Sequence, residues 1–238
     1  MSNGTIPHEP LVFVISAPSG SGKSTLVARL LETVPGLTFS VSFTTRQRRG
    51  VEREGVEYNY ISREEFEARI ARHEFLEWAL VFGNYYGTHI GVLEEARRRH
   101  TDVVLDIDVQ GARQLKDRIP DAISIFILAP SRDELEQRLR ARSEDAQPVI
   151  DRRLREAAEE IRNYDRYDYV IVNRQIEESA AVLAAIVRAE RARRLPAATL
   201  RDAAEEQACA LAASARRARM EDRIRPILAT FEIQKSEV

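Results

Sequence analysis

Short apolar runs alternate with segments of helical periodicity along most of this chain. The apolar runs are continuous rather than alternating, which is typical of strands buried on both faces of a parallel sheet. They lie at residues 11–16, 38–43, 103–107, 122–128 and 169–172. Helices are predicted at residues 22–34, 110–117, 133–141, 149–163 and 177–194. This alternation predicts an α/β fold with a mostly parallel sheet covered by helices.

Two segments interrupt this rhythm. Residues 51–88 hold extended, aromatic-rich pieces at 56–61 and 75–82 around one short helix, which predicts a small antiparallel insertion. Residues 138–153 are charged and contain Pro148, which suggests a mobile cap. Capping boxes are expected at two helix starts, Ser62 with Glu65 and Ser131 with Glu134.

The chain changes composition after Pro196, where Ala, Arg and Glu dominate. A helix is expected over residues 199–220, but its apolar face is mostly alanine and would bury little area. The segment therefore either packs on the domain or a partner, or forms a solvated or partly disordered tail.

The segment after the first apolar run has the composition of a phosphate-binding P-loop. It reads Ser16-Ala17-Pro18-Ser19-Gly20-Ser21-Gly22-Lys23-Ser24-Thr25 and leads into a predicted helix. Backbone N–H groups of such a turn surround the phosphates of a nucleoside triphosphate, Lys23 would reach the β- and γ-phosphates, and Ser24 would bind Mg²⁺. Ala17 stands where the full pattern has glycine, so its φ must be negative. The simpler alternative is a small polar turn between a strand and a helix.

Bulk composition suits a soluble enzyme. The 238 residues fit one domain with a small lid or appendage, and the net charge of −2 gives no global attraction to nucleic acid or a membrane. The single cysteine, Cys209, excludes an internal disulfide and suits a reducing cytoplasm. No apolar stretch approaches membrane-spanning length, and the first ten residues are polar. We therefore expect a cytoplasmic protein.

A second anion site is suggested by residues 40–50, which present hydroxyl groups together with Arg46, Arg48 and Arg49. Guanidinium groups clustered after a strand match phosphate oxygens, although a solvated basic loop explains them as well. The hydroxyl groups of Tyr58 and Tyr86 would complete a phosphate cradle, but tyrosines in strands are more often core or rim residues.

Three carboxylates lie in or after predicted strands. Glu77 interrupts an apolar run, and it either points to solvent, the more usual case for a strand glutamate, or faces a pocket. In a pocket it would accept the adjacent N1–H and N2–H₂ of guanine, which adenine lacks. Asp106 and Asp108 end another strand, where one would act through Mg²⁺ and its water while the other faces the acceptor. Ordinary helix capping is the alternative for Asp108.

Taken together, five segments resemble the guanylate kinase family over residues 10–194. They read SAPSGSGKS from residue 16, SVSFTTR from 40, FGNYYGT from 82, LDIDVQG from 105 and YVIVN from 169. The second and third are specific to this family among P-loop proteins. The resemblance implies ATP and GMP as substrates with Mg²⁺, monomers or homo-oligomers, and no nucleic-acid or membrane partner.

The resemblance also implies a domain plan and site residues. A P-loop core would take residues 10–44, 89–137 and 154–195, a GMP-binding insertion 45–88, a lid 138–153 and a helical extension 196–238. The implied guanine-reading residues are Ser42, Glu77, Thr88 and Asp108. The implied phosphate cradle is Arg46, Arg49, Tyr58 and Tyr86. The implied lid arginines are Arg138, Arg142 and Arg153, and Asn173 falls near the adenine of ATP.

Some positions depart from the family pattern. They are Phe43 in place of His, Arg48 in place of Pro, Gly50 one position early, residues 142–145 in place of a glycine-rich lid, and Arg174 in place of an acid. These changes concern loop geometry and rate rather than the reaction.

Three other interpretations compete with an ATP:GMP phosphotransferase. A non-catalytic guanylate-kinase-like interaction module usually lacks a working P-loop, whereas this chain has Gly22, Lys23 and Ser24. A P-loop kinase with a different acceptor would use the guanine-reading residues for another group. Nucleic-acid binding through the Arg-rich tail is disfavoured because acidic residues are interspersed there.

Overall fold

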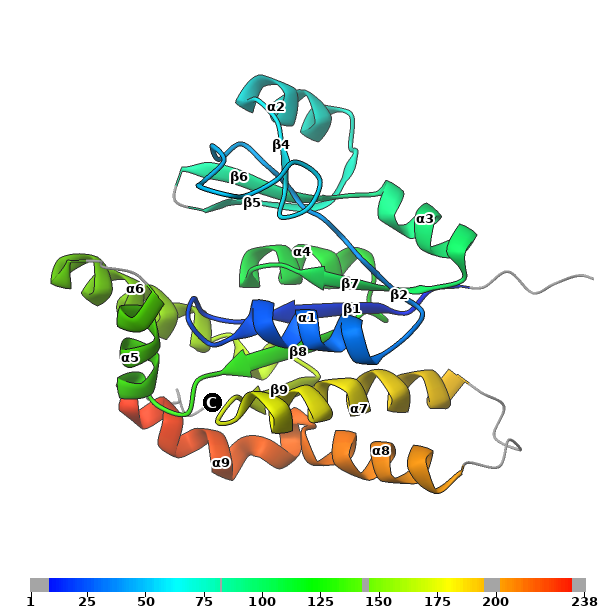
Figure 1. The fold of residues 1–238 in the computed structure, drawn as a ribbon, viewed down its shortest axis with the longest axis vertical. Coiled ribbons are helices and arrows are strands. Elements are labelled where there is room, and N and C mark those ends of the chain that lie inside the picture. Colours follow the sequence, from blue (N-terminus) through cyan, green and yellow to red (C-terminus); the bar gives the residue numbers. More distant parts are fainter. Residues whose placement is uncertain (1–8, 82, 143–145, 195–201, 233–238) are drawn as a thin grey trace, which may run out of the picture. The chain divides into compact units, whose positions relative to one another are not determined.

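A computed structural model describes residues 9–81, 83–142, 146–194 and 202–232 (Figure 1). The chain forms two compact units, of which the first comprises Met1–Val14 and Pro35–Ile123 and the second Ile15–Val34 and Ser124–Val238. One sheet has the strand order β2-β7-β1-β8-β9, and its pairs β2–β7 and β8–β9 are parallel. The other sheet has the order β4-β3-β6-β5. A mostly parallel sheet with flanking helices confirms the predicted α/β class.

Within the described residues, the first unit contains nine complete elements besides the start of β1 (Val12–Ser16) and the first residue of β8. They are β2 (Leu37–Phe39), β3 (Phe43–Thr44), β4 (Asn59–Tyr60), α2 (Arg63–Ala71), β5 (Phe75–Val81), β6 (Asn84–His89), α3 (Gly91–Arg99), β7 (Asp102–Asp106) and α4 (Val109–Arg118). Buried Asp102 accepts a 2.8 Å hydrogen bond from the Leu11 amide, so the edge of β7 is tied to the start of the β1 segment.

The small sheet of this unit differs from the prediction in two respects. The strand expected at 38–43 is divided, because residues from Phe43 onward pair with β6 rather than continuing along β7. The piece expected at 56–61 is a strand only at Asn59–Tyr60, because Gly55, at φ +74°, turns the chain just before it. β4 also runs parallel to β3, so the insertion is mixed rather than purely antiparallel.

The second unit holds the end of β1 and the remaining elements. They are α1 (Lys23–Thr33), most of β8 (Ile123–Leu128), α5 (Arg132–Arg142), α6 (Gln147–Ile161), a 3₁₀ turn (Tyr164–Arg166), β9 (Tyr169–Val172), α7 (Ile176–Arg194), α8 (Ala203–Ser214) and α9 (Arg217–Thr230). Much of the predicted interruption at 138–153 is therefore helical, with Pro148 in the first turn of α6. Residues 143–145 lie outside the described part of the chain.

The C-terminal extension packs on the second unit as two helices, where one was predicted (Figure 1). The Val170 amide donates to the Ala215 carbonyl oxygen at 2.9 Å, and Arg216 pairs with Tyr169 as an antiparallel bridge on β9. The Arg216 guanidinium lies 4.2 Å from the Tyr169 ring centroid and 2.8 Å from Glu190. Over residues 202–232, the packed alternative is thus confirmed and the solvated one is wrong.

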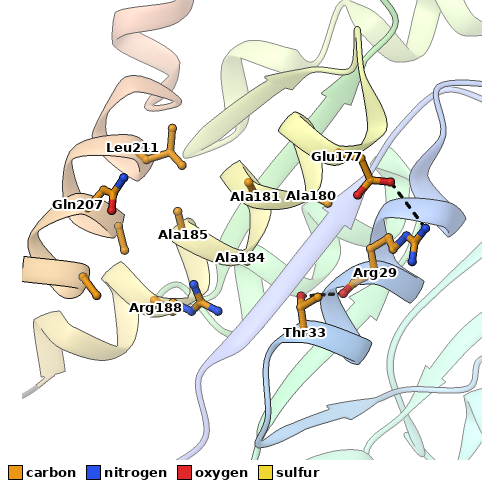
Figure 2. Close-up of a pocket in the computed structure, with 12 residues that line it drawn as sticks. Arg29, Thr33, Glu177, Ala180, Ala181, Ala184, Ala185, Arg188, Gln207 and Leu211 are labelled. Atoms are coloured by element: carbon orange, nitrogen blue, oxygen red, sulfur yellow. Dashed lines mark hydrogen bonds and ion pairs between the residues drawn. The ribbon is translucent and has the colours of Figure 1, made fainter.

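A cavity of about 420 Å³ remains between α1, α7 and α8 (Figure 2). Its wall is rich in alanine, and Arg29 of α1 and Glu177 of α7 approach each other to 3.6 Å at one end. The cavity remains open because alanine side chains are too short to fill the space between the three helices. None of the described helices is long and apolar enough to cross a membrane.

Candidate active site

The P-loop connects β1 to α1 in the second unit. Gly20 and Gly22 have φ of +90° and +92°, in the left-handed region that side chains rarely adopt. A Cβ atom on Gly22 would lie 2.4 Å from Nδ2 of Asn173, and one on Gly20 would lie 2.9 Å from Cδ2 of Leu139. Ala17 does not have positive φ, so alanine fits there as the sequence required.

The start of α1 is suited to an anion. Gly22 supplies no side-chain cap, and the first turn of α1 carries no acidic residue. The backbone N–H groups and the helix dipole at this end therefore favour phosphate. Lys23 is the first residue of the helix, Ser24 and Thr25 are exposed, and the buried Ser21 hydroxyl has no hydrogen-bond partner in the described structure.

Two side chains from other elements contact the loop, and a third contacts one of them. Asn173, at the end of β9 and 1% exposed, donates from Nδ2 to the Ser21 carbonyl oxygen at 2.8 Å. Arg138 donates to the Asn173 carbonyl oxygen at 2.8 Å, and Arg153 of α6 donates to Ser19 Oγ at 2.7 Å. The structure thus brings Arg138, Arg153 and Asn173 to the P-loop, whereas the side chain of Arg142 lies outside the described part.

The predicted phosphate cradle in the first unit is built around Arg46. This residue is buried, and its guanidinium lies 5.3 Å from the ring centroid of Tyr58, whose ring meets that of Tyr86 edge-on at 5.6 Å. The interpretation as a solvated basic loop is therefore wrong for Arg46 and applies only to the exposed Arg48 and Arg49. The geometry gathers one guanidinium and two phenol rings in one place.

Sequence reasoning missed Glu52, which pairs with Arg46 at 2.8 Å. Its carboxylate also accepts from the Arg49 amide and the Tyr60 hydroxyl, each at 2.8 Å. The pKa of Glu52 is lowered to about 2, mainly by its hydrogen bond with Arg46 and less by those from the Arg49 amide and the Tyr60 hydroxyl. The pairing with Glu52 also raises the pKa of Arg46. A carboxylate six residues after an arginine in a turn gave no signal in the sequence, because the turn geometry brings them together.

Glu77 of β5 faces the protein interior and is 3% exposed, so the solvent-facing orientation was wrong. Thr88 donates from Oγ1 to Glu77 Oε1 at 2.6 Å. Burial, and to a smaller extent the charge of Asp108, raises the pKa of Glu77 to about 7. The pairing register of β5 and β6 shifts between Phe75 and Glu77, and a bulge of this kind redirects side chains.

Asp108 and Ser42 complete the predicted acceptor residues. Asp108 is the N-cap of α4 and accepts from the Gly111 amide at 2.8 Å, so the capping alternative is confirmed, while its charge still acts on Glu77. Ser42 is half-buried just before β3, and its carbonyl oxygen accepts from the Asn59 amide at 2.9 Å. Asp106 is the half-buried last residue of β7.

Each unit carries one of the residues predicted to hold Mg²⁺. The Ser24 hydroxyl of the second unit and the Asp106 carboxylate of the first are hard oxygen ligands, which Mg²⁺ prefers. Within the described residues, no group of three or more His, Cys, Asp or Glu side chains is placed to hold a metal. Oxygen donors of this kind suit a cation that is bound largely through nucleotide phosphates and water.

A P-loop on a mostly parallel sheet, together with an arginine–tyrosine cluster and a buried carboxylate in a small insertion, defines the class of P-loop nucleotide phosphotransferases. The family model "Guanylate kinase" matches residues 9–190. Guanylate kinases of Koribacter versatilis and Symbiobacterium thermophilum are 56% and 50% identical, over 77% and 79% of this chain and 80% and 90% of theirs. The crystal structure of guanylate kinase from Anaplasma phagocytophilum has a TM-score of 0.64 at 38% identity, covering 77% of this chain and 87% of that one. The chain belongs to the guanylate kinase family.

Proposed function

We propose that this protein transfers the γ-phosphoryl group of ATP to GMP, giving ADP and GDP. The observation that carries the acceptor assignment is the buried Glu77 carboxyl beside Thr88 and Asp108. Its ionised form accepts the parallel N1–H and N2–H₂ donors of guanine, a pair that adenine, cytosine and uracil do not present. A carboxylate is costly to bury without donors, so guanine supplies what the pocket lacks.

On the donor side, residues 17–25 hold the ATP phosphates and Lys23 neutralises the β- and γ-phosphates. Arg138, Arg142 and Arg153 of the lid region act on the transferring group, and Asn173 lies near the adenine. Ser24 would hold Mg²⁺ directly, and Asp106 would hold it through water. When bound, Mg²⁺ neutralises charge on the β- and γ-phosphate oxygens.

On the acceptor side, Arg46 and Arg49 hold the GMP phosphate with the hydroxyl groups of Tyr58 and Tyr86. Ser42, Thr88 and Asp108 join Glu77 around the base. Glu52 and the phosphate share Arg46, since Glu52 contacts Nη2 and a guanidinium has five N–H donors.

The chemical step needs positioning and charge neutralisation rather than a base. A phosphate monoester has a second pKa near 6 and is mostly dianionic at neutral pH. One GMP phosphate oxygen attacks the γ-phosphorus of ATP, the bond from that phosphorus to the β,γ-bridging oxygen breaks, and ADP leaves with the electron pair. The arginines hold the attacking oxygen in line despite the repulsion between two anions.

ADP release measured with GMP, AMP, CMP and UMP in parallel tests the proposal. ADP release with GMP alone is the expected result. Lys23→Ala should remove most of the activity with the fold intact. Lys116→Ala, at a lysine of α4 that is not part of the P-loop motif, should retain it. If no nucleotide supported ADP release and the protein bound a protein partner tightly, it would be an interaction module rather than an enzyme. Near-normal turnover by Lys23→Ala would overturn the mechanism.

We also propose that the protein works in the cytoplasm, which the presence of only one cysteine, Cys209, in the sequence supports. A reducing compartment keeps such a thiol from forming disulfides between chains.

A further inference from the structure

The outer edge of β5 is closed by side chains of α4. Among the described strands β5 is the last of its sheet, so one row of its backbone N–H and C=O groups has no partner in those strands. Gln114 satisfies both groups of Trp78: Nε2 donates to the Trp78 carbonyl oxygen at 2.7 Å, and Oε1 accepts from the Trp78 amide at 3.3 Å. Arg118 donates from Nη1 to the Phe75 carbonyl oxygen. The primary amide of Gln114 thus substitutes for a neighbouring strand.

These contacts flank Glu77, which lies between Phe75 and Trp78 in the chain. The β5–β6 pairing is irregular at this point, so the ladder to β6 alone fixes the backbone less firmly. The Glu77 carboxylate also lies against α4, because a Cβ atom on Gly111 would be 2.2 Å from Oε2. Gly111, Gln114 and Arg118 are spaced i, i+3 and i+7, which places them on one face of the helix.

We propose that Gln114 is a positioning residue for acceptor specificity. Its amide fixes the backbone beside Glu77, and this fixes the direction in which the carboxylate meets the N1–H and N2–H₂ of guanine. The proposal rests on the proposed guanine-reading role of Glu77. Gln114 itself touches the strand rather than the substrate. When the amide is removed, the edge of β5 loosens and the buried carboxylate turns toward water, because an ionised group in an apolar site gains by solvation.

The test compares GMP with IMP, whose base lacks the exocyclic 2-amino group. Gln114→Met keeps the length of the side chain and removes both hydrogen bonds. We expect the ratio of kcat/KM for GMP to that for IMP to fall about tenfold, the effect of one to two lost hydrogen bonds. The KM for ATP and the kcat at saturating GMP should not change. Arg113→Met places the same side chain on the exposed face of α4 and should leave every parameter as it is.

A double variant separates positioning from a general loss of structure. If Gln114 acts through Glu77, Gln114→Met should change the GMP/IMP ratio very little in a Glu77→Gln background, because effects on one interaction are not additive. Gln114→Glu keeps an acceptor for the Trp78 amide but sets a carboxylate oxygen against the Trp78 carbonyl oxygen. It should therefore lower the ratio at least as far as Gln114→Met, and it carries the test if the methionine variant does not fold.

The outcomes distinguish this proposal from the one on which it rests. A changed GMP/IMP ratio in Glu77→Gln with an unchanged ratio in both Gln114 variants overturns the role of Gln114 alone. An unchanged ratio in Glu77→Gln overturns the guanine-reading role itself. Equal losses for GMP, IMP and ATP in the Gln114 variants also overturn positioning, because they indicate damage to the whole fold.

Discussion

Glu77→Gln should make the folded protein more stable at alkaline pH while weakening its use of GMP. The carboxyl is 3% exposed, and its pKa is raised to about 7 in the folded protein from 4.5 for the free side chain. The folded state therefore binds more protons than the unfolded state between these two values. Stability contributed by this group is fully present below about pH 4.5 and is lost as the pH rises through about 7.

The magnitude follows from the two pKa values. One pKa unit corresponds to about 1.4 kcal/mol, so ionised Glu77 lowers the free energy of unfolding by about 3 kcal/mol above pH 7 relative to its protonated form. Glutamine has the same shape and carries no charge, and its carbonyl oxygen still accepts from Thr88. Its buried NH₂ group costs part of the gain. The expected net stabilisation near pH 8 is about 1–3 kcal/mol.

Urea unfolding of the two proteins at about pH 5.5 and about pH 8 measures this difference. The advantage of Glu77→Gln should be large at the higher pH and small at the lower one. Glu94→Gln, at an exposed glutamate of α3, provides the surface control. A free energy of unfolding with the same pH dependence in wild type and Glu77→Gln would refute the reasoning, because it would mean that burial does not perturb this carboxyl.

The same titration should appear in catalysis. Only the ionised carboxyl accepts both guanine donors, so kcat/KM for GMP should fall in the wild type as the pH drops below about 7. The GMP phosphate also titrates near pH 6, and the Glu77→Gln profile isolates that contribution. Identical profiles for the two proteins would show that Glu77 does not titrate in this range.

Three further substitutions test other contacts. Gly111→Ala should raise the KM for GMP about tenfold and spare that for ATP, since the new Cβ displaces the Glu77 carboxylate; equal kinetics would refute this. Asn173→Ala should raise the KM for ATP severalfold because the Ser21 carbonyl oxygen loses its donor. An unchanged KM would show that this hydrogen bond does not position the P-loop for ATP. Arg216→Ala should lower the free energy of unfolding by about 1–2 kcal/mol and leave the kinetics unaltered. Urea denaturation measures this loss, and an unchanged urea midpoint would contradict the prediction.

The P-loop and the strands of the main sheet were predictable because their signals are local. Continuous apolar runs and a small-residue turn with Gly20 and Gly22 depend on neighbouring residues only. β3 was not predictable, because Phe43 leaves one sheet for another through pairing with residues more than forty positions away. The contact of Gln114 with Trp78 spans 36 positions and has no sequence pattern either.

The extension shows a signal that sequence reasoning overlooked. Met220, Ile224, Ile227, Leu228 and Phe231 recur at helical spacing and are all buried. The predicted helix ended at residue 220, and Pro226 inside α9 interrupts the usual helix pattern. The buried side chains of α8 are the alanines Ala208 and Ala212, whereas the larger buried side chains of the extension lie in α9.

Glu77 is the position where the expectation that a strand glutamate faces solvent was wrong, and we attribute this to its proposed role in binding guanine. Strand glutamates usually face water, and this one is buried because Thr88 donates to it and because Gly111 of α4 leaves room for its carboxylate. The same helix takes Asp108 as its N-cap. One helix therefore holds both carboxylates of the proposed guanine pocket, Asp108 directly and Glu77 through the edge of β5. Substitutions on this face of α4 should consequently alter the choice of acceptor before they alter the use of ATP.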